Sequence, residues 1–117
     1  MKDVTIYHNP RCSKSRETLA LLEQQGLQPK VVPYLDSPPS VAQLQQLLHQ
    51  LGFSSARELM RKKEDLYKQL QLADAGLSEQ QLLQAMVDNP KLIERPIVVN
   101  GHQARIGRPP EQVLEIL

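Results

Sequence analysis

The 117-residue sequence predicts a single α/β domain, residues 1–117, built on a four-stranded mixed sheet with a helical insertion between the second and third strands. Three observations lead to this prediction. A strand, helix and strand pattern opens the chain, a leucine-rich stretch at helical spacing fills its middle, and an Asn-Gly pair joins two apolar runs near its end. The length is typical of one compact domain.

The chain begins with a strand followed by a helix. The stretch "DVTIYH" alternates β-branched and aromatic residues and then meets Asn9-Pro10, a turn signal that should end the strand near Tyr7. A helix is expected from Ser13 to Gln25, and Gly26 is a natural stop. The predicted buried face of this helix carries Leu19 and Leu22 in line with Cys12 and Ser15.

A second strand, "KVVPYL", completes the first β-α-β half, residues 1–36. The right-handed crossover of such a unit makes its two strands parallel. Pro33 lacks the N–H that a sheet ladder needs, so this strand is expected at an edge of the sheet.

The middle of the chain, residues 40–90, is expected to be a helical insert. Leucines recur at helical spacing after Ser40, and Gly52 ends this first stretch. Shorter helices follow in "SSARELMRKK" and "EDLYKQL", and Ser78 with Gln81 forms a capping-box pattern. We therefore expect residues 40–89 to be wholly helical, with Asn89-Pro90 as the end.

The last part, residues 91–117, is expected to be a β-β-α half. Asn100-Gly101 lies between two apolar alternating runs, which predicts a hairpin with a type I′ turn. A final helix starts at Pro109-Pro110, with Val113, Leu114 and Leu117 as its apolar face. The complete order of elements is typical of the thioredoxin-like (glutaredoxin-like) fold.

Composition narrows the classes of function. The net charge is +1, from 14 basic and 13 acidic side chains, so no long-range field favours nucleic acid or an anionic membrane. No apolar run has the roughly 20 residues of a membrane span, and the N-terminus lacks the apolar core of a signal peptide, so we expect a cytoplasmic protein. One cysteine supports neither an internal disulfide nor a cysteine-based zinc site.

That cysteine, Cys12, lies in "HNPRCSKSRETL", where the first strand passes into the first helix. The free N–H groups of a helix start and nearby cations lower a thiol pKa. His8, Arg11, Lys14 and Arg16 are the candidate cations. The simpler interpretations are a buried apolar cysteine and a turn histidine bonded to local backbone, and the position of Cys12 among basic residues favours a reactive thiolate.

The arginines are the second group of candidate site residues. Arg95 directly precedes the predicted hairpin and Arg108 directly follows it, so both should lie at one end of it. By analogy with thioredoxin-like sheets, the Arg95-Pro96 bond should be cis and opposite the cysteine. Arg57, Arg61 and Arg105 would singly be solvated surface charges. A thiolate surrounded by guanidinium groups suggests attack on an anionic substrate, because the guanidinium fork matches two oxyanion oxygens.

With Cys12, Arg61, Arg95 and Arg108 in place, the sequence resembles the glutaredoxin-coupled, ArsC-type arsenate reductases. The motifs that carry the resemblance run in order through nearly the whole chain: "TIYHNPRCSKSRETL", "LMRKKEDLY", "ERPIVV" and "IGRPPEQVLEIL". Arg11 and Lys14 differ from the best-known members, and the chain ends at Leu117 without their C-terminal extension. Both features indicate the shorter, YfgD-like branch.

The resemblance implies a thiol-dependent enzyme of arsenic detoxification. Cys12 would form a covalent arsenate intermediate, while Arg61, Arg95 and Arg108 hold the oxyanion. His8 would help to keep Cys12 ionised, with Ser15 and Arg16 as further candidates for stabilising the thiolate and Pro96 in a structural role. Glutathione, a thiol co-substrate, would attack the bound arsenic, and glutaredoxin would resolve the adduct and release arsenite. No bound cofactor and no metal are implied.

Two other families share parts of this pattern. Spx-like regulators have this fold and bind RNA polymerase, but they usually carry a second cysteine where this chain has Ser15. Monothiol glutaredoxins could have the C-x-x-S motif, but they lack the helical insert and an arginine at position 95. Within the reductase interpretation, the substrate could also be another oxyanion.

Overall fold

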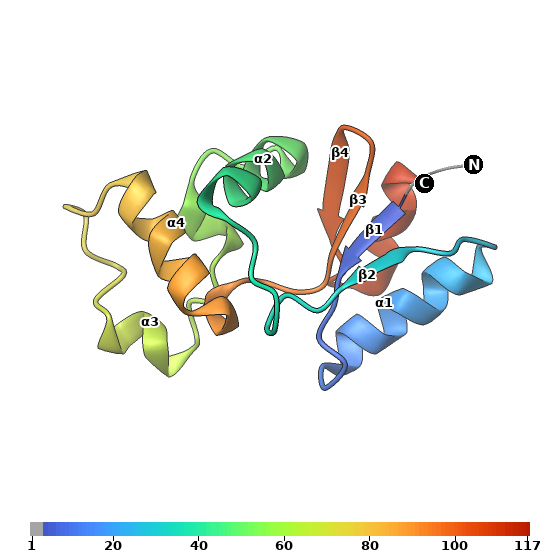
Figure 1. The fold of residues 1–117 in the computed structure, drawn as a ribbon, viewed down its shortest axis with the longest axis horizontal. Coiled ribbons are helices and arrows are strands. Elements are labelled where there is room, and N and C mark those ends of the chain that lie inside the picture. The colour runs from blue at the N-terminus through green and yellow to red at the C-terminus, as the bar shows by residue number, and fades with distance from the viewer. Residues whose placement is uncertain (1–3) are drawn as a thin grey trace. The chain divides into compact units, whose positions relative to one another are not determined.

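The computed structural model describes residues 4–117 and divides the chain into two compact units (Figure 1). The first unit is made from the chain up to Ser37 together with Arg95–Leu117, and the second from Pro38–Glu94. Asp3, with which the first strand was predicted to begin, lies outside the described residues. Between residues 4 and 117, no helix is long and apolar enough to cross a bilayer.

The first unit contains the predicted four-stranded mixed sheet, and its strand order is β2-β1-β3-β4. β1 (Val4–Tyr7) pairs in parallel with β2 (Lys30–Val32) and antiparallel with β3 (Ile97–Asn100), which in turn pairs antiparallel with β4 (Gln103–Ile106). β2 is an edge strand, as Pro33 indicated, but it ends before that proline instead of continuing to Leu35. The pairing of β1 with β3 joins the N-terminal and C-terminal parts of this unit.

One face of this sheet is covered by α1 (Ser13–Gln24) and by the C-terminal helical segment. Ile6 lies opposite Val98 in the register, so both side chains project to the same face. The buried core of the unit consists of Val4, Ile6, Leu22, Val98, Val113 and Ile116. On α1 the fully buried positions are Ser15, Thr18 and Leu22, whereas Leu19, predicted for this face, is only partly buried.

The hairpin between β3 and β4 lies where Asn100-Gly101 predicted it, but its turn is of another type. Asn100 pairs with Gln103, which leaves Gly101 and His102 as the two loop residues. Of these two loop residues, Gly101 has a positive φ, +63°, and His102 does not. A glycine with positive φ at the first loop position is the type II′ pattern, so the predicted type I′ turn is wrong.

The C-terminal segment, η3 (Pro110–Ile116), is a 3₁₀ helix instead of the expected α-helix. With three residues per turn, side chains three apart are eclipsed on one face. Pro110, Val113 and Ile116 accordingly are buried, and Leu114 is 40% exposed. The prediction that Val113, Leu114 and Leu117 form the apolar face was therefore wrong for Leu114, because it assumed the α-helical period.

The second unit is mainly helical but not wholly so. It contains five helical segments: α2 (Val41–Leu51), η1 (Ala56–Leu59), α3 (Asp65–Gln69), α4 (Glu79–Asp88) and η2 (Pro90–Leu92). Residues 60–64 and 70–78 lie outside them, and Met60 pairs with Ile93 in an isolated bridge. The expected helix in "SSARELMRKK" is reduced to η1. The capping box at Ser78 with Gln81 is confirmed, and Ser40 with Gln43 forms another.

Arg57 is a structural residue of the second unit and not a solvated charge. Its Nε donates to the Leu72 carbonyl at 3.1 Å, and its Nη2 donates to the Asp74 carbonyl at 2.6 Å. These two bonds satisfy backbone acceptors in the segment between α3 and α4. Removing the side chain should therefore affect the fold of this unit.

The 3₁₀ geometry of η3 predicts that substitutions at Leu114 and Ile116 lower the free energy of unfolding by different amounts. Ile116→Ala should lower the free energy of unfolding by about 2 to 4 kcal/mol, because it truncates a buried side chain. Leu114→Ala, at an exposed position, should cost less than about 1 kcal/mol. Denaturant unfolding of both variants measures this difference, and equal costs would contradict the 3₁₀ register.

Candidate functional site

Cys12 is the N-cap residue of α1, at the point where the chain leaves β1. Its N–H donates to the Asn9 carbonyl at 3.0 Å, and the Asn9 side-chain oxygen accepts from the Arg11 N–H, so Asn9 holds the turn that carries the thiol. The side chain of Cys12 makes no capping hydrogen bond and is 8% exposed. Its sulfur therefore occupies the place of the usual capping oxygen, facing the first N–H groups of the helix.

Arg108 reaches this sulfur from the opposite end of the chain. Its Nη2 lies 3.5 Å from the Cys12 Sγ, and its Nε donates to the Arg95 carbonyl at 2.8 Å. The Arg95-Pro96 bond is cis, as predicted, and the Arg108-Pro109 bond is also cis. One guanidinium thus links the thiol to the segment that precedes β3.

Arg95 supplies unused donors. Its Nε and Nη1 are buried and have no hydrogen-bond partner among residues 4–117. Buried polar groups are almost always satisfied, and a buried guanidinium without an acceptor is costly. The two N–H groups are therefore suited to a bound anion.

Opposing influences set the pKa of Cys12. Burial is the largest, and on its own it would raise the pKa, because it removes water from the thiolate. The backbone N–H groups of Ser15 and Lys14 and the charges of Arg95 and Arg108 act in the other direction. Together they outweigh burial and leave the pKa of Cys12 below its ordinary value. The thiolate form of Cys12 is therefore favoured, although its sulfur is largely removed from water.

His8 and Ser15 form a buried polar pair beside this turn. The Ser15 Oγ accepts from the Asn9 N–H at 3.0 Å and lies 2.7 Å from the His8 Nδ1. Burial, and then the charge of Arg16, lowers the pKa of His8, so the imidazole is neutral at pH 7. We assign the Ser15 proton to Nδ1, which leaves the His8 proton on Nε2. His8 consequently does not act as a cation on the thiolate at this pH.

The other basic residues near Cys12 in the sequence have local partners instead. Arg16 donates to the Pro10 carbonyl at 3.1 Å, and Lys14 pairs with Glu17 on the exposed side of α1. Arg11 is exposed. The side-chain charges that lower the pKa of Cys12 are those of Arg95 and Arg108, and a contribution from the charges of Arg11, Lys14 and Arg16 stays a prediction. Lys14 contributes through its backbone N–H.

Arg61 belongs to the second unit, where two carboxylates hold it. It forms a short ion pair with Glu64 and a second pair, at 3.8 Å, with Glu94. Glu94 directly precedes Arg95 in the chain. The sequence interpretation missed both carboxylates, although the spacing of Arg61 and Glu64 at i, i+3 could have predicted their contact.

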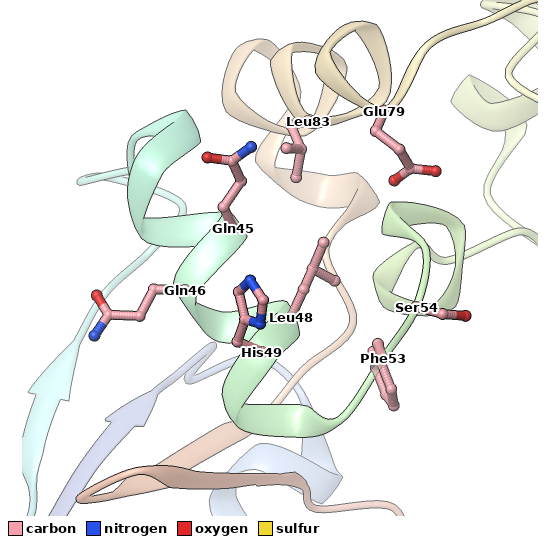
Figure 2. Close-up of a pocket in the computed structure, with 8 residues that line it drawn as sticks. All are labelled: Gln45, Gln46, Leu48, His49, Phe53, Ser54, Glu79 and Leu83. Atoms are coloured by element: carbon pink, nitrogen blue, oxygen red, sulfur yellow. The ribbon is translucent and has the colours of Figure 1, made fainter.

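A hollow of about 540 Å³ lies in the second unit, between α2 and α4 (Figure 2). Its lining residues are Gln45, Gln46, Leu48, His49, Phe53, Ser54, Glu79 and Leu83. Its one carboxylate is already used, because Glu79 accepts from the Ser55 hydroxyl and the Ala56 N–H. Residues 4–117 contain no cluster of three or more His, Cys, Asp or Glu that could hold a metal ion. The thiol site is therefore the stronger candidate for chemistry.

The chemistry available at the thiol site follows from its charges. A thiolate at a helix start is a nucleophile, and two guanidinium groups beside it attract an anion that would otherwise be repelled. Arg108 is exposed, Arg95 has buried N–H groups without a partner, and the charges of both act on Cys12. This combination is suited to attack by sulfur on the central atom of an oxyanion.

Comparisons with known proteins agree with this arrangement. The sequence profile described as the ArsC family matches residues 7–116. The chain is 69% identical to the uncharacterized protein YfgD of Escherichia coli over 99% of this chain and 98% of that protein. It is 55% identical to an arsenate reductase of Haemophilus influenzae, over 97% and 98% respectively. The structure of an arsenate reductase from Vibrio cholerae superposes with a TM-score of 0.98 at 62% identity, over 99% and 98%.

The lowered pKa of Cys12 predicts how reactivity and stability depend on pH. Iodoacetamide should alkylate the folded protein with an apparent pKa below the value of about 8.5 for an ordinary cysteine. The folded state then binds fewer protons than the unfolded state, so the free energy of unfolding rises with pH across this interval. This contribution is fully present above the unfolded pKa and is lost as the pH falls through the folded pKa.

Urea-unfolded protein provides the control for the alkylation profile, and Cys12→Ala should remove the corresponding slope of stability against pH. Coinciding alkylation profiles for the folded and unfolded protein would show that the arginines and the helix start do not act on the thiol.

Proposed function

Since the chain belongs to the ArsC family, we propose that it is an arsenate reductase in which Cys12 is the nucleophile. One observation carries the proposal: the guanidinium of Arg108 lies 3.5 Å from the Cys12 sulfur, while Arg95 beside it keeps two buried N–H groups without a partner. These groups are the donors that an arsenate needs when it approaches an anionic sulfur.

The first step is formation of a covalent intermediate. The Cys12 thiolate attacks arsenic, an As–S bond forms, and one As–O bond breaks. The departing oxygen takes up two protons and leaves as water. Arg95 and Arg108 offset the negative charge on the remaining oxygens, which grows as the anionic sulfur approaches.

Reduction of arsenic(V) to arsenic(III) takes two electrons, and two external thiols would supply them. The glutathione thiol attacks the cysteine-bound arsenic, a second As–S bond forms, and a second oxygen leaves as water. A glutaredoxin thiol then attacks the glutathione sulfur, so that the electron pair of this As–S bond returns to arsenic. Water releases arsenite and restores the Cys12 thiol. The balance is arsenate plus two thiols giving arsenite, one disulfide and water. External thiols suit a chain with one cysteine, and their supply suits a cytoplasmic location.

Arg61 enters the proposal as a third ligand of the oxyanion. In its present contacts the guanidinium is neutralised by Glu64 and Glu94. Binding arsenate would require it to exchange a carboxylate for the substrate. The contribution of Arg61 should therefore be smaller than that of Arg95, whose N–H groups have no partner to give up.

The alternative of an Spx-like regulator that binds RNA polymerase is not favoured. The family match covers residues 7–116, and similar proteins are named arsenate reductases. Ser15, at the position of the second switch cysteine, instead has its hydroxyl engaged with Asn9 and His8.

The covalent step predicts that Cys12→Ser abolishes arsenate turnover while the fold is retained, because serine is close in volume but far less nucleophilic at neutral pH. The assay measures arsenite formation with glutathione and glutaredoxin together, with each alone, and with neither. Wild-type turnover should require both thiols. Near-normal activity in Cys12→Ser would exclude Cys12 as the nucleophile, and turnover without added glutathione would exclude the proposed co-substrate.

The proposed contacts of the arginines with arsenate predict losses of kcat/KM that differ from one arginine to another. Arg95→Ala and Arg108→Ala should each lower the kcat/KM for arsenate by the equivalent of about 2 to 5 kcal/mol, the usual cost of truncating one partner of a buried charge pair. Arg61→Ala should lose less. Lysine at position 108 should restore only part of the loss, because it lacks the planar fork.

Arg105→Ala is the matched control for these variants, since Arg105 belongs to the same unit and pairs with the exposed Glu115. Its kcat/KM should stay within a few-fold of wild type. Arg57→Ala is unsuitable because Arg57 binds the carbonyls of Leu72 and Asp74, which are distant in the sequence, whereas the carbonyl that Arg105 binds is that of its neighbour Ala104. Losses no larger than that of Arg105→Ala would show that these arginines do not bind the substrate.

A further inference from the structure

Gly107 lies between the end of β4 and Arg108, and it is buried. Its N–H donates to the Pro96 carbonyl at 2.9 Å, which ties the Arg108 segment to the start of β3. Gly107 is not among the glycines with positive φ, so its backbone does not require glycine for conformational reasons. The reason for a glycine at this position has to be the space around it.

That space is too small for a methyl group. A Cβ on Gly107 would lie 2.5 Å from the Thr18 Oγ1, 2.9 Å from the Pro96 Cγ and 3.1 Å from the Thr18 Cγ2. All three distances are shorter than ordinary van der Waals contacts, which lie near 3.5 to 4.0 Å for carbon atoms. The loop therefore packs directly against α1 on one side and against the proline ring on the other.

Neither neighbour can easily move aside. Thr18 is completely buried, and its hydroxyl donates to the Lys14 carbonyl at 2.8 Å, which fixes its rotamer. Pro96 has a closed ring and is also buried. A side chain at position 107 would therefore displace the loop itself, away from α1.

The loop carries the guanidinium that reaches the thiol. Arg108 follows Gly107 directly, and its Nε and Nη2 contact the Arg95 carbonyl and the Cys12 sulfur. Cys12 caps the N-terminus of α1 and Thr18 lies near the middle of the same helix, so the contact of Gly107 with Thr18 sets the distance between the loop and the helix that presents the sulfur. A shift of about 1 Å in such an arrangement can cost up to about a hundredfold in rate.

We propose that Gly107 is a positioning residue, whose missing side chain allows the loop to close on Thr18 and Pro96 and so holds the Arg108 guanidinium against the Cys12 sulfur. The role in catalysis rests on the proposed function, in which Arg108 binds the oxyanion. The contact with the sulfur is a property of the folded protein alone.

The test uses Gly107→Ala with two measurements. Alkylation of Cys12 by iodoacetamide as a function of pH should show a higher apparent pKa than in the wild type, approaching that of Arg108→Ala. The KM for arsenate should rise in both variants, because both weaken a contact with the bound anion. Gly76→Ala is the matched control, since its Cβ would meet only the exposed Asp74 side chain, at 3.3 Å, and both measurements should stay at wild-type values.

A double-mutant cycle separates positioning from a general loss of stability. If Gly107 acts through Arg108, adding Gly107→Ala to Arg108→Ala should leave the alkylation profile unchanged. An unchanged profile in the single Gly107→Ala variant, or fully additive effects in the double variant, would overturn the proposal. Because alkylation needs no arsenate, failure of the proposed function would appear separately, as absence of arsenate turnover in the wild type.

A second variant keeps the test readable if Gly107→Ala does not fold. Thr18→Ala in the same chain removes two of the three close contacts and leaves the one with the Pro96 Cγ. The double variant Gly107→Ala/Thr18→Ala should fold. The apparent pKa of Cys12 in it should lie between the values in Thr18→Ala and in Arg108→Ala. A folded double variant with the alkylation profile of Arg108→Ala would show that relief at Thr18 does not restore the position of Arg108, against the proposal.

Discussion

The contact between the Arg108 guanidinium and the Cys12 sulfur depends on one strand pairing and on two hydrogen bonds of the loop that carries Arg108. It joins the N-cap of α1 to a residue 96 positions later in the chain. Pairing of β1 with β3 brings these segments together, and the Gly107 N–H bond to Pro96 and the Arg108 bond to the Arg95 carbonyl hold the loop in place. The sheet is thus the scaffold on which a thiol and two guanidinium groups meet.

The burial of Cys12 makes this arrangement necessary. Removing water from a thiolate raises its pKa, so a shielded cysteine without compensation would be a protonated and weak nucleophile. Backbone N–H groups at the start of α1 and the two arginine charges reverse the effect. In the proposed function, the same guanidinium groups that favour the thiolate would also favour an anionic substrate, so one set of charges would serve the nucleophile and the oxyanion.

Some of the basic residues near Cys12 in the sequence have partners of their own. Arg16 and Lys14 form local bonds with Pro10 and Glu17, and burial and the charge of Arg16 keep His8 neutral at pH 7. In the second unit, Arg61 is balanced by Glu64 and Glu94 and Arg57 holds two backbone carbonyls. Among the arginines of residues 4–117, Arg95 is the one with buried N–H groups that lack a partner. An arginine suited to bind an anion is therefore recognised by buried N–H groups without a hydrogen-bond partner, more than by its closeness to the cysteine in the sequence.

The sequence by itself determined the strands, the parallel edge strand, the hairpin position, the cis bond at Arg95-Pro96 and the location of Cys12 at a helix start. These features depend on local patterns, such as alternation and Asn-Pro and Asn-Gly turns, except for the cis bond, which was expected by analogy with thioredoxin-like sheets. Only the tertiary structure decided the 3₁₀ period of η3, the burial of Thr18, the neutral state of His8 and the partners of Arg57 and Arg61. Each of these depends on atoms brought close by packing, and a sequence pattern does not specify which distant donor, acceptor or apolar surface a side chain will meet.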